Sequence, residues 1–142
     1  MLGEGTSQLE LRVRELEPPT PQSLGGDVRL AVRVRFGDFA GAADAWILRD
    51  AWDAFLADLR TLDERRRGEA LLQGISPGEL RLRFFARDRA GHLAVEGEVG
   101  TRAHGREALL RFDPIEIDPS SLPALARELT SAVTALDREV GR

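Results

Sequence analysis

The sequence predicts an α+β protein, with a mostly antiparallel sheet of about six strands and two helices packed on one face of the sheet. Several short segments alternate between apolar and polar residues, which is typical of half-buried strands. Two longer segments place apolar residues at helical spacing. Short turns join neighbouring alternating segments, and such hairpins are antiparallel. A length of 142 residues with 42% hydrophobic residues corresponds to a single domain over residues 1–142.

The N-terminal part is predicted to contain one strand between two irregular segments. Residues 9–14 alternate strictly between apolar and charged side chains, which predicts a strand. Residues 1–8 are small and polar, so we expect them to be flexible. Residues 17–27 are rich in proline and glycine, so we expect a loop there.

The clearest hairpin is predicted over residues 28–47. The alternating run that ends at Phe36 is followed by Gly37-Asp38, a pair that suits a two-residue turn. With Phe36 opposite Phe39, the apolar residues of both strands remain on one face throughout.

A second hairpin is predicted over residues 80–99, and the segment Asp88 to Gly91 is its turn. Its register places Arg83 opposite Glu96 and Arg81 opposite Glu98, so two cross-strand ion pairs are predicted. Two further strands are predicted, a short one at Leu71-Leu72 before this hairpin and another over residues 108–117 after it. Pro114 implies that this last strand lies at an edge or contains a bulge.

The two predicted helices each have one apolar stripe. Asp50 is the predicted N-cap of the first helix, and Gly68 is its predicted end. Asp118 opens the start signal of the second helix. The predicted buried residues are Trp52, Phe55, Leu56, Leu59 and Leu62 in the first helix, and Leu122, Leu125, Ala126, Leu129, Val133 and Leu136 in the second, with Val140 as the last candidate of that stripe.

The composition excludes several kinds of chemistry. There is no cysteine, so disulfides and thiolate sites are excluded, and all 20 basic residues are arginine, so no lysine can form a Schiff base. The absence of lysine, asparagine and tyrosine is typical of a GC-rich genome, and codon bias can itself enrich arginine. No apolar run is long enough for a membrane helix and no leader opens the chain, so we expect a cytoplasmic protein that does not associate with membranes.

We predict no catalytic, cofactor-binding or metal-binding residues, and therefore no enzyme. His92 and His104 are the two histidines, and they do not share a spacing typical of metal ligands. No glycine-rich phosphate loop and no serine nucleophile motif is present.

The candidate binding surface is the face of the sheet that the helices leave open. Arginines outnumber acids on this face, although the chain has a net charge of −4. Such a surface fits an acidic partner or a phosphate backbone, and the alternative is a solvated sheet whose charges are paired with each other. The predicted partner-binding residues are Arg29, Arg33, Arg35, Arg81, Arg83 and Phe85.

Residues 27–136 resemble the WapI-type immunity proteins and their bacterial relatives. The motifs that carry the resemblance are Phe39-Ala40-Gly41 before Ala45-Trp46-Ile47, Trp52-x-x-Phe55 in the first helix, Asp88-x-x-Gly91-His92 and Asp118-x-x-x-Leu122. The resemblance implies a small α+β protein that is not an enzyme and that binds and neutralises a cognate toxin.

Two other functions are compatible with the residues. The arginine face could bind nucleic acid or another anion, although few aromatic residues accompany it for base stacking. Alternatively, the chain could be a structural subunit that forms a homodimer through a sheet edge or an apolar helix face.

Overall fold

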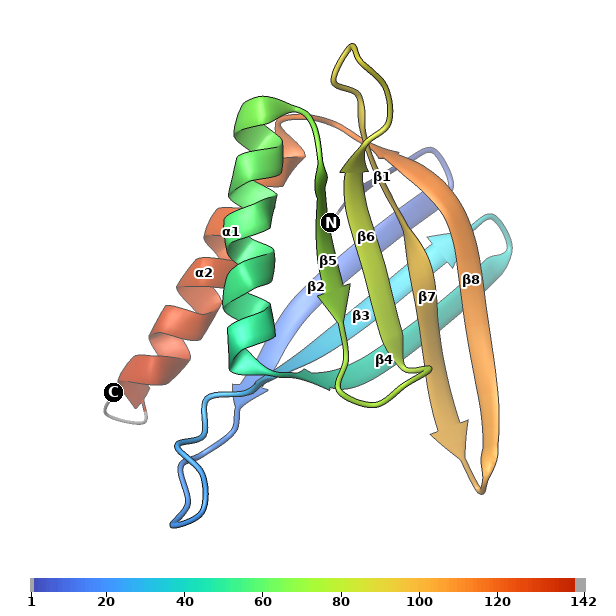
Figure 1. Ribbon diagram of the computed structural model, residues 1–142. Helices are drawn as coiled ribbons and strands as arrows, with labels where there is room; N and C mark the ends of the chain where they lie inside the picture. Colours follow the sequence, from blue (N-terminus) through green and yellow to red (C-terminus); the bar gives the residue numbers. More distant parts are fainter. Residues whose placement is uncertain (1, 140–142) are drawn as a thin grey trace.

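The computed structural model describes residues 2–139, which form two four-stranded antiparallel sheets and two helices (Figure 1). The first sheet contains β1 (Leu2–Glu4), β2 (Ser7–Leu16), β3 (Val28–Phe36) and β4 (Phe39–Ile47), in that order. The second contains β5 (Glu69–Gln73), β6 (Leu80–Ala86), β7 (Leu93–Ala103) and β8 (Arg106–Ile117), also in that order. The helices are α1 (Arg49–Arg65) and α2 (Ser121–Glu139).

The α+β class is confirmed, but the prediction of one sheet of about six strands is wrong. All strand pairs within each sheet are neighbours in the chain, and α1 separates the two groups of four strands. Alternation shows that one face of each strand is buried, but it does not show what covers that face. In the structure, the apolar faces of the two sheets and of both helices share one core.

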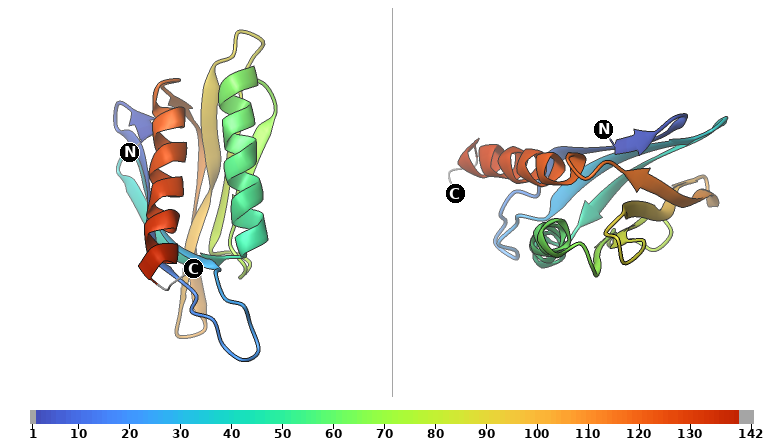
Figure 2. Two further views of the ribbon diagram at one scale, coloured as in Figure 1. Left: turned by 90° about the vertical axis from the view of Figure 1, so that its left-hand side faces the viewer. Right: turned by 90° about the horizontal axis from the view of Figure 1, so that it is seen from above.

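The sheets and helices enclose this core from several sides. Gly41 of β4 marks a close contact between the sheets, because a Cβ atom there would lie 3.0 Å from Val99 of β7 and 3.1 Å from Leu110 of β8. The helices lie side by side (Figure 2). They are not stacked on one face of a single sheet as predicted, since α1 packs on β5 of the second sheet and α2 on β2 of the first.

The predicted hairpin registers are confirmed. Phe36 pairs with Phe39 in β3–β4, and Arg83 pairs with Glu96 in β6–β7. Arg81 lies opposite Glu98 as predicted, but the predicted ion pair between them is wrong for the described residues, because Glu98 pairs with Arg111 of β8 (3.3 Å). Gly37 has a φ of 63°, as the tight turn requires. Pro114 lies in β8, which is an edge strand, and the β7–β8 register shifts next to it, so both expectations for this proline are met.

Residues 2–8 form β1, a turn and the start of β2, where the sequence led us to expect a flexible segment. Met1 and the predicted core residue Val140 lie outside the described residues. Leu2 pairs with Leu9, and both side chains are buried in the core. The apolar Leu2 therefore holds β1 against β2. The predicted loop over residues 17–27 connects β2 to β3.

The predicted Asp50 cap of α1 is wrong, because the helix already begins at Arg49 and its N-cap residue is Leu48, whose side chain makes no capping bond. A distant loop supplies an acceptor for the first turn instead. The backbone N–H of Arg49 donates a hydrogen bond to the carboxylate of Asp27 (2.9 Å). The guanidinium of Arg49 then reaches Asp137 of α2 (3.1 Å), which raises the pKa of Arg49. At the other end, Arg66 adopts the left-handed conformation and ends the helix before Gly68. Within residues 2–139, neither helix is apolar enough over its length to cross a bilayer.

Candidate protein-binding surface

The six predicted partner-binding residues do not form one surface. Arg29, Arg33 and Arg35 extend from β3 on the outward side of the first sheet, and Arg81, Arg83 and Phe85 extend from β6 on the outward side of the second. Because the inward sides of both sheets share one core, these two outer faces point away from each other (Figure 2). The expectation of a single open arginine face followed from the single sheet and is wrong for the same reason.

The β2–β4 outer face is defined by register as the outward residues of three neighbouring strands. Their pairing brings charged side chains of β2 and β3 beside small side chains of β4. The residues are Gln8, Glu10, Arg12 and Glu15 of β2, Arg29, Ala31, Arg33 and Arg35 of β3, and Ala40, Ala42, Asp44 and Trp46 of β4. Arg14 belongs to this face as well, since it lies at the bulge of β2 and lines the same depression as Arg12 and Arg33.

Arg29 is bound within this face to two acidic residues. Its guanidinium makes a two-pronged contact with Asp44, with both N–O distances at 2.8 Å, and a third bond of 3.0 Å to Glu15. These hydrogen bonds, first that of Asp44 and then that of Glu15, raise the pKa of Arg29. Arg29 is therefore already occupied, which leaves it little capacity for a partner.

The other arginines of this face behave differently. Arg12, Arg14, Arg33 and Arg35 have no ion pair and no side-chain hydrogen bond with any other residue that the structure describes. All four are exposed. Glu10 lies opposite Arg33 in the strand register but forms no ion pair with it in the described part of the chain. These four guanidinium groups keep their full hydrogen-bonding capacity for an external ligand.

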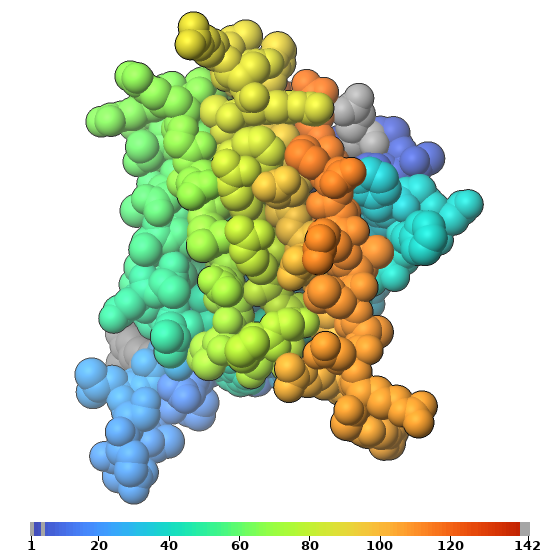
Figure 3. Space-filling model, turned by 45° about the vertical axis from the view of Figure 1, so that its right-hand side comes forward, coloured from blue at the N-terminus to red at the C-terminus, as the bar shows by residue number. Residues whose placement is uncertain are grey.

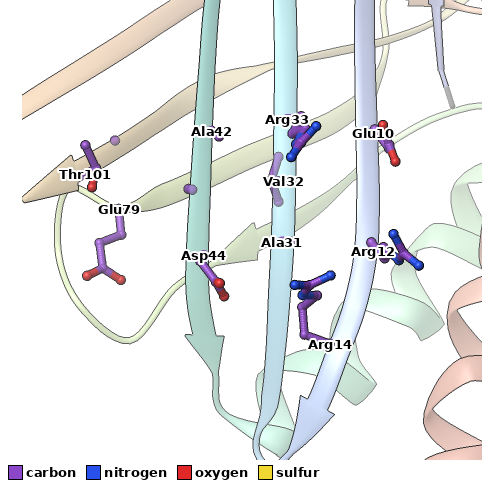
Figure 4. A pocket seen from close by; sticks show the side chains of 12 residues that line it. Glu10, Arg12, Arg14, Ala31, Val32, Arg33, Ala42, Asp44, Glu79 and Thr101 are labelled. Atoms are coloured by element: carbon purple, nitrogen blue, oxygen red, sulfur yellow. The ribbon is translucent and has the colours of Figure 1, made fainter.

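A shallow trough runs over this face. Its first part is a depression of about 400 Å³ bounded by Arg12, Arg14, Arg33, Asp44 and Glu79 (Figure 4). A second part of about 460 Å³ shares Arg33 with the first and continues past Arg35. A third part of about 430 Å³ shares Arg35 with the second and reaches the β3–β4 turn. We call these three adjoining depressions the arginine trough.

The floor of the arginine trough consists of alanines, which the sequence analysis did not single out. Ala31 lines the first part, Ala40 the second and third parts, and Ala42 the first and second parts. A larger side chain at these outward positions would fill the trough. The signal in the sequence is the run of small residues from Ala40 to Ala43, whose outward members are Ala40 and Ala42.

The β5–β8 outer face, which lies on the far side of the core, presents the four strands side by side (Figure 3). Its charged residues alternate in sign from one strand to the next. The outward residues are Glu69, Leu71, Gln73, Arg81, Arg83, Phe85, Glu96, Glu98, Arg111 and Glu116.

Arg83 is the centre of the charge network on this face. Its guanidinium bonds to Glu69 of β5 and to Glu96 of β7 (2.9 Å), and it lies 4.1 Å from the ring centroid of Phe85. The hydrogen bond to Glu69 is the larger cause of the raised pKa of Arg83, and that to Glu96 adds to it against the opposing effect of partial burial. Arg111 pairs similarly with Glu98 at 3.3 Å. Arg83 and Phe85 are thus engaged within the sheet, whereas Arg81 is exposed and has no ion pair in the described part.

The two histidines lie in separate turns of the second sheet. His92 lies in the β6–β7 turn, where its Nδ1 is 2.7 Å from the carboxylate of Asp88. This hydrogen bond raises the pKa of His92 and lowers that of Asp88. His104 is exposed at the β7–β8 turn. Among residues 2–139, no group of three or more histidine, aspartate or glutamate side chains is arranged to hold a metal ion.

Comparison with known proteins identifies the family. No curated protein and no solved structure matched the chain. The model of the immunity protein WapI-like family matches residues 1–137, which is nearly the whole sequence and includes both sheets and most of α2. The chain therefore belongs to the immunity protein WapI-like family.

Proposed function

We propose that this protein is an immunity protein that binds a toxin protein directly and blocks it by contact, without catalysing a reaction. Membership of the WapI-like family over residues 1–137 is the observation that carries this proposal. The structure supports a binding role through an exposed outer face on which four arginines keep free hydrogen-bonding groups. Direct contact of this kind needs no catalytic group, only a complementary surface.

A nucleic-acid or anion binder is the second candidate function, and the four unpaired arginines favour it. Two observations weigh against it. The chain has a net charge of −4, which repels a long polyanion that extends beyond the arginines more than a short acidic segment confined to them. The aromatic residue on the β2–β4 outer face is Trp46, which is half-buried, so this face offers little for base stacking.

Capture followed by a toxicity assay tests the proposed function. The tagged full chain would be used to capture partners from a nuclease-treated lysate of the source organism, and a stoichiometric protein partner would be identified. That partner would then be expressed in a bacterial host with and without this protein. We expect growth arrest without it and normal growth with it.

Two results would refute the proposed function. One is a captured protein that is harmless when expressed alone. The other is a toxic partner whose effect persists when this protein is present in excess. An unrelated acidic protein of similar length, expressed from the same vector, controls for the burden of expression.

A further inference from the structure

The arginine trough combines unpaired arginines, a floor of small residues and a regular arginine spacing, which together suit one kind of partner segment. Four acidic residues also line it, so the attraction for an acidic group is local to the unpaired arginines; they are Glu10, Asp38, Asp44 and Glu79. We propose that it binds an acidic, extended segment of the protein partner, whose carboxylates pair with Arg33 and Arg35 of β3. This inference rests on the proposed function, because it names the surface and the partner chemistry through which that function would operate.

Charge is the first argument. A guanidinium group bonds to a carboxylate through two parallel N–H groups, as Arg29 does with Asp44 on this same face. Arg33 and Arg35 lie on the same strand and on the same face, yet neither has such a partner among the described residues. The contrast within one strand shows that the acceptor groups for Arg33 and Arg35 are not supplied by the described part of the chain.

Spacing is the second argument. Arg33 and Arg35 are two residues apart on β3, so their side chains leave the strand about 7 Å apart. Alternate residues of an extended partner segment have the same repeat, so acidic residues at every second position would meet both arginines. On the neighbouring strand β2, Arg12 and Arg14 line the part of the trough that also contains Asp44, so unpaired arginines are present along both β2 and β3.

Shape is the third argument. The alanine floor at Ala31, Ala40 and Ala42 lets a backbone approach the sheet closely between the arginine side chains. The trough is continuous from Asp44 to the β3–β4 turn, which is the length of most of β4. Asp44 is already bound to Arg29 at one end, so an acidic segment would be drawn toward Arg33 and Arg35 at the other.

The test uses a synthetic peptide of alternating glutamate and serine, labelled with a fluorophore, and the full chain at low ionic strength. Binding is followed by fluorescence anisotropy, and the contacted amides are mapped by NMR. We expect saturable binding, with shifted amides along residues 31–35 and 40–44, and weakening as salt is added. A peptide of alternating lysine and serine should not shift the amides of residues 31–35 and 40–44, wherever else it associates with a chain of net charge −4.

Charge-reversal variants locate the site. The double variant R33E/R35E should weaken peptide binding about tenfold or more, because it replaces attraction by repulsion at both contacts. The matched control is R81E/R127E, which makes the same change in net charge at two exposed arginines on other surfaces that have no ion pair in the described part. It should stay within about twofold of the original chain. Circular dichroism checks that each variant is folded. If the charge reversal disturbs the sheet, R33A/R35A replaces it, and this variant should also weaken peptide binding because it removes both guanidinium groups.

Three outcomes would overturn the inference. The first is an equal loss in both double variants, which would indicate only general electrostatics. The second is tighter binding of oligothymidylate than of the acidic peptide, which would indicate a nucleic-acid surface. The third is full toxin neutralisation by R33E/R35E, which would place the interface elsewhere and leave the proposed function intact. A failure of the proposed function is distinct, because the original chain would then bind the peptide but protect no cell.

Discussion

On the β5–β8 outer face, Arg83 and Arg111 each have acidic partners on neighbouring strands, whereas on the β2–β4 outer face Arg33 and Arg35 have none among the described residues. Both faces are rich in arginine in a chain that contains no lysine, so composition does not distinguish them. The difference lies in whether ion pairs form. On the second face, Arg83 and Arg111 pair with acidic residues of neighbouring strands, and this network stabilises the sheet. On the first face, Arg33 lies between Ala42 and Glu10 without an ion pair in the described part of the chain, and Arg35 lies beside Ala40, so both guanidinium groups remain available to a partner.

The two arginine faces are separate surfaces only if the sheets pack against each other through their inward sides. A substitution at Gly41, where the inward sides of the two sheets meet, tests this arrangement. Gly41→Leu would place a large side chain where even a Cβ lies 3.0 Å from Val99 and 3.1 Å from Leu110. We expect a loss of about 2 kcal/mol in the free energy of unfolding, measured by urea denaturation, because overpacking forces the sheets apart.

Ala42→Leu is the matched control, since Ala42 is the next residue of β4 and faces outward into the arginine trough. Its unfolding free energy should change by no more than about 0.5 kcal/mol. Similar losses in both variants would contradict the back-to-back arrangement and with it the separation of the two arginine faces.

Alanine variants of Arg83 and Arg33 measure how much the ion pairs on the β5–β8 outer face contribute to the free energy of unfolding. Arg83→Ala removes contacts with Glu69, Glu96 and the ring of Phe85, and it leaves the two carboxylates without their shared cation. The site is partly open to solvent, so we expect a loss of only about 1 kcal/mol in the free energy of unfolding. Arg33→Ala should leave stability unchanged to within about 0.5 kcal/mol, because Arg33 has no such contacts.

The same pair of variants should behave in the opposite way toward a partner. Arg33→Ala should weaken binding of the acidic peptide and Arg83→Ala should not. A stability loss on replacing Arg33 as large as that on replacing Arg83 would show that both faces use their arginines structurally.

The hairpins could be predicted from the sequence because their information is local. The alternation of residues and the Gly37 turn determine the β3–β4 register, and the charge match of Arg83 with Glu96 supports the β6–β7 register. The bulge at Pro114 could be predicted too, since a proline has no N–H to contribute to a ladder.

The number of sheets could not be predicted by the same reasoning. An apolar face packs equally well on a helix or on a second sheet, so the pattern does not choose between one sheet and two. The acceptor for the first turn of α1 was missed for a related reason, because Asp27 lies 22 residues before Arg49 and is brought there only by the completed fold. The error in sheet number then propagated to the candidate site and merged two separate arginine faces into one.

The smallest expected effect concerns a pH-dependent ion pair at the end of the second sheet. The Asp88 carboxylate raises the pKa of His92 above its ordinary value of about 6.5, and His92 in turn lowers the pKa of Asp88. The contribution of His92 to stability is fully present below pH 6.5 or so and is lost as the pH rises through its higher folded-state pKa. That of Asp88 is present above its ordinary pKa and is lost as the pH falls through its lowered folded-state pKa. Both contributions to stability are therefore fully present between the ordinary pKa of Asp88, about 3.8, and the ordinary pKa of His92, about 6.5.

Asp88→Asn should return the pKa of His92 toward its ordinary value, and an NMR titration of the imidazole protons measures the shift. His104 in the β7–β8 turn is the internal control, since it is far from Asp88 in the chain and makes no ion pair within residues 2–139. Because His92 is exposed, the change in stability should be small. Binding of the acidic peptide to the arginine trough should keep the same pH dependence in the variant, because His92 lies on the second sheet. A shift in that dependence would show that the two faces are coupled through the core and are not independent surfaces.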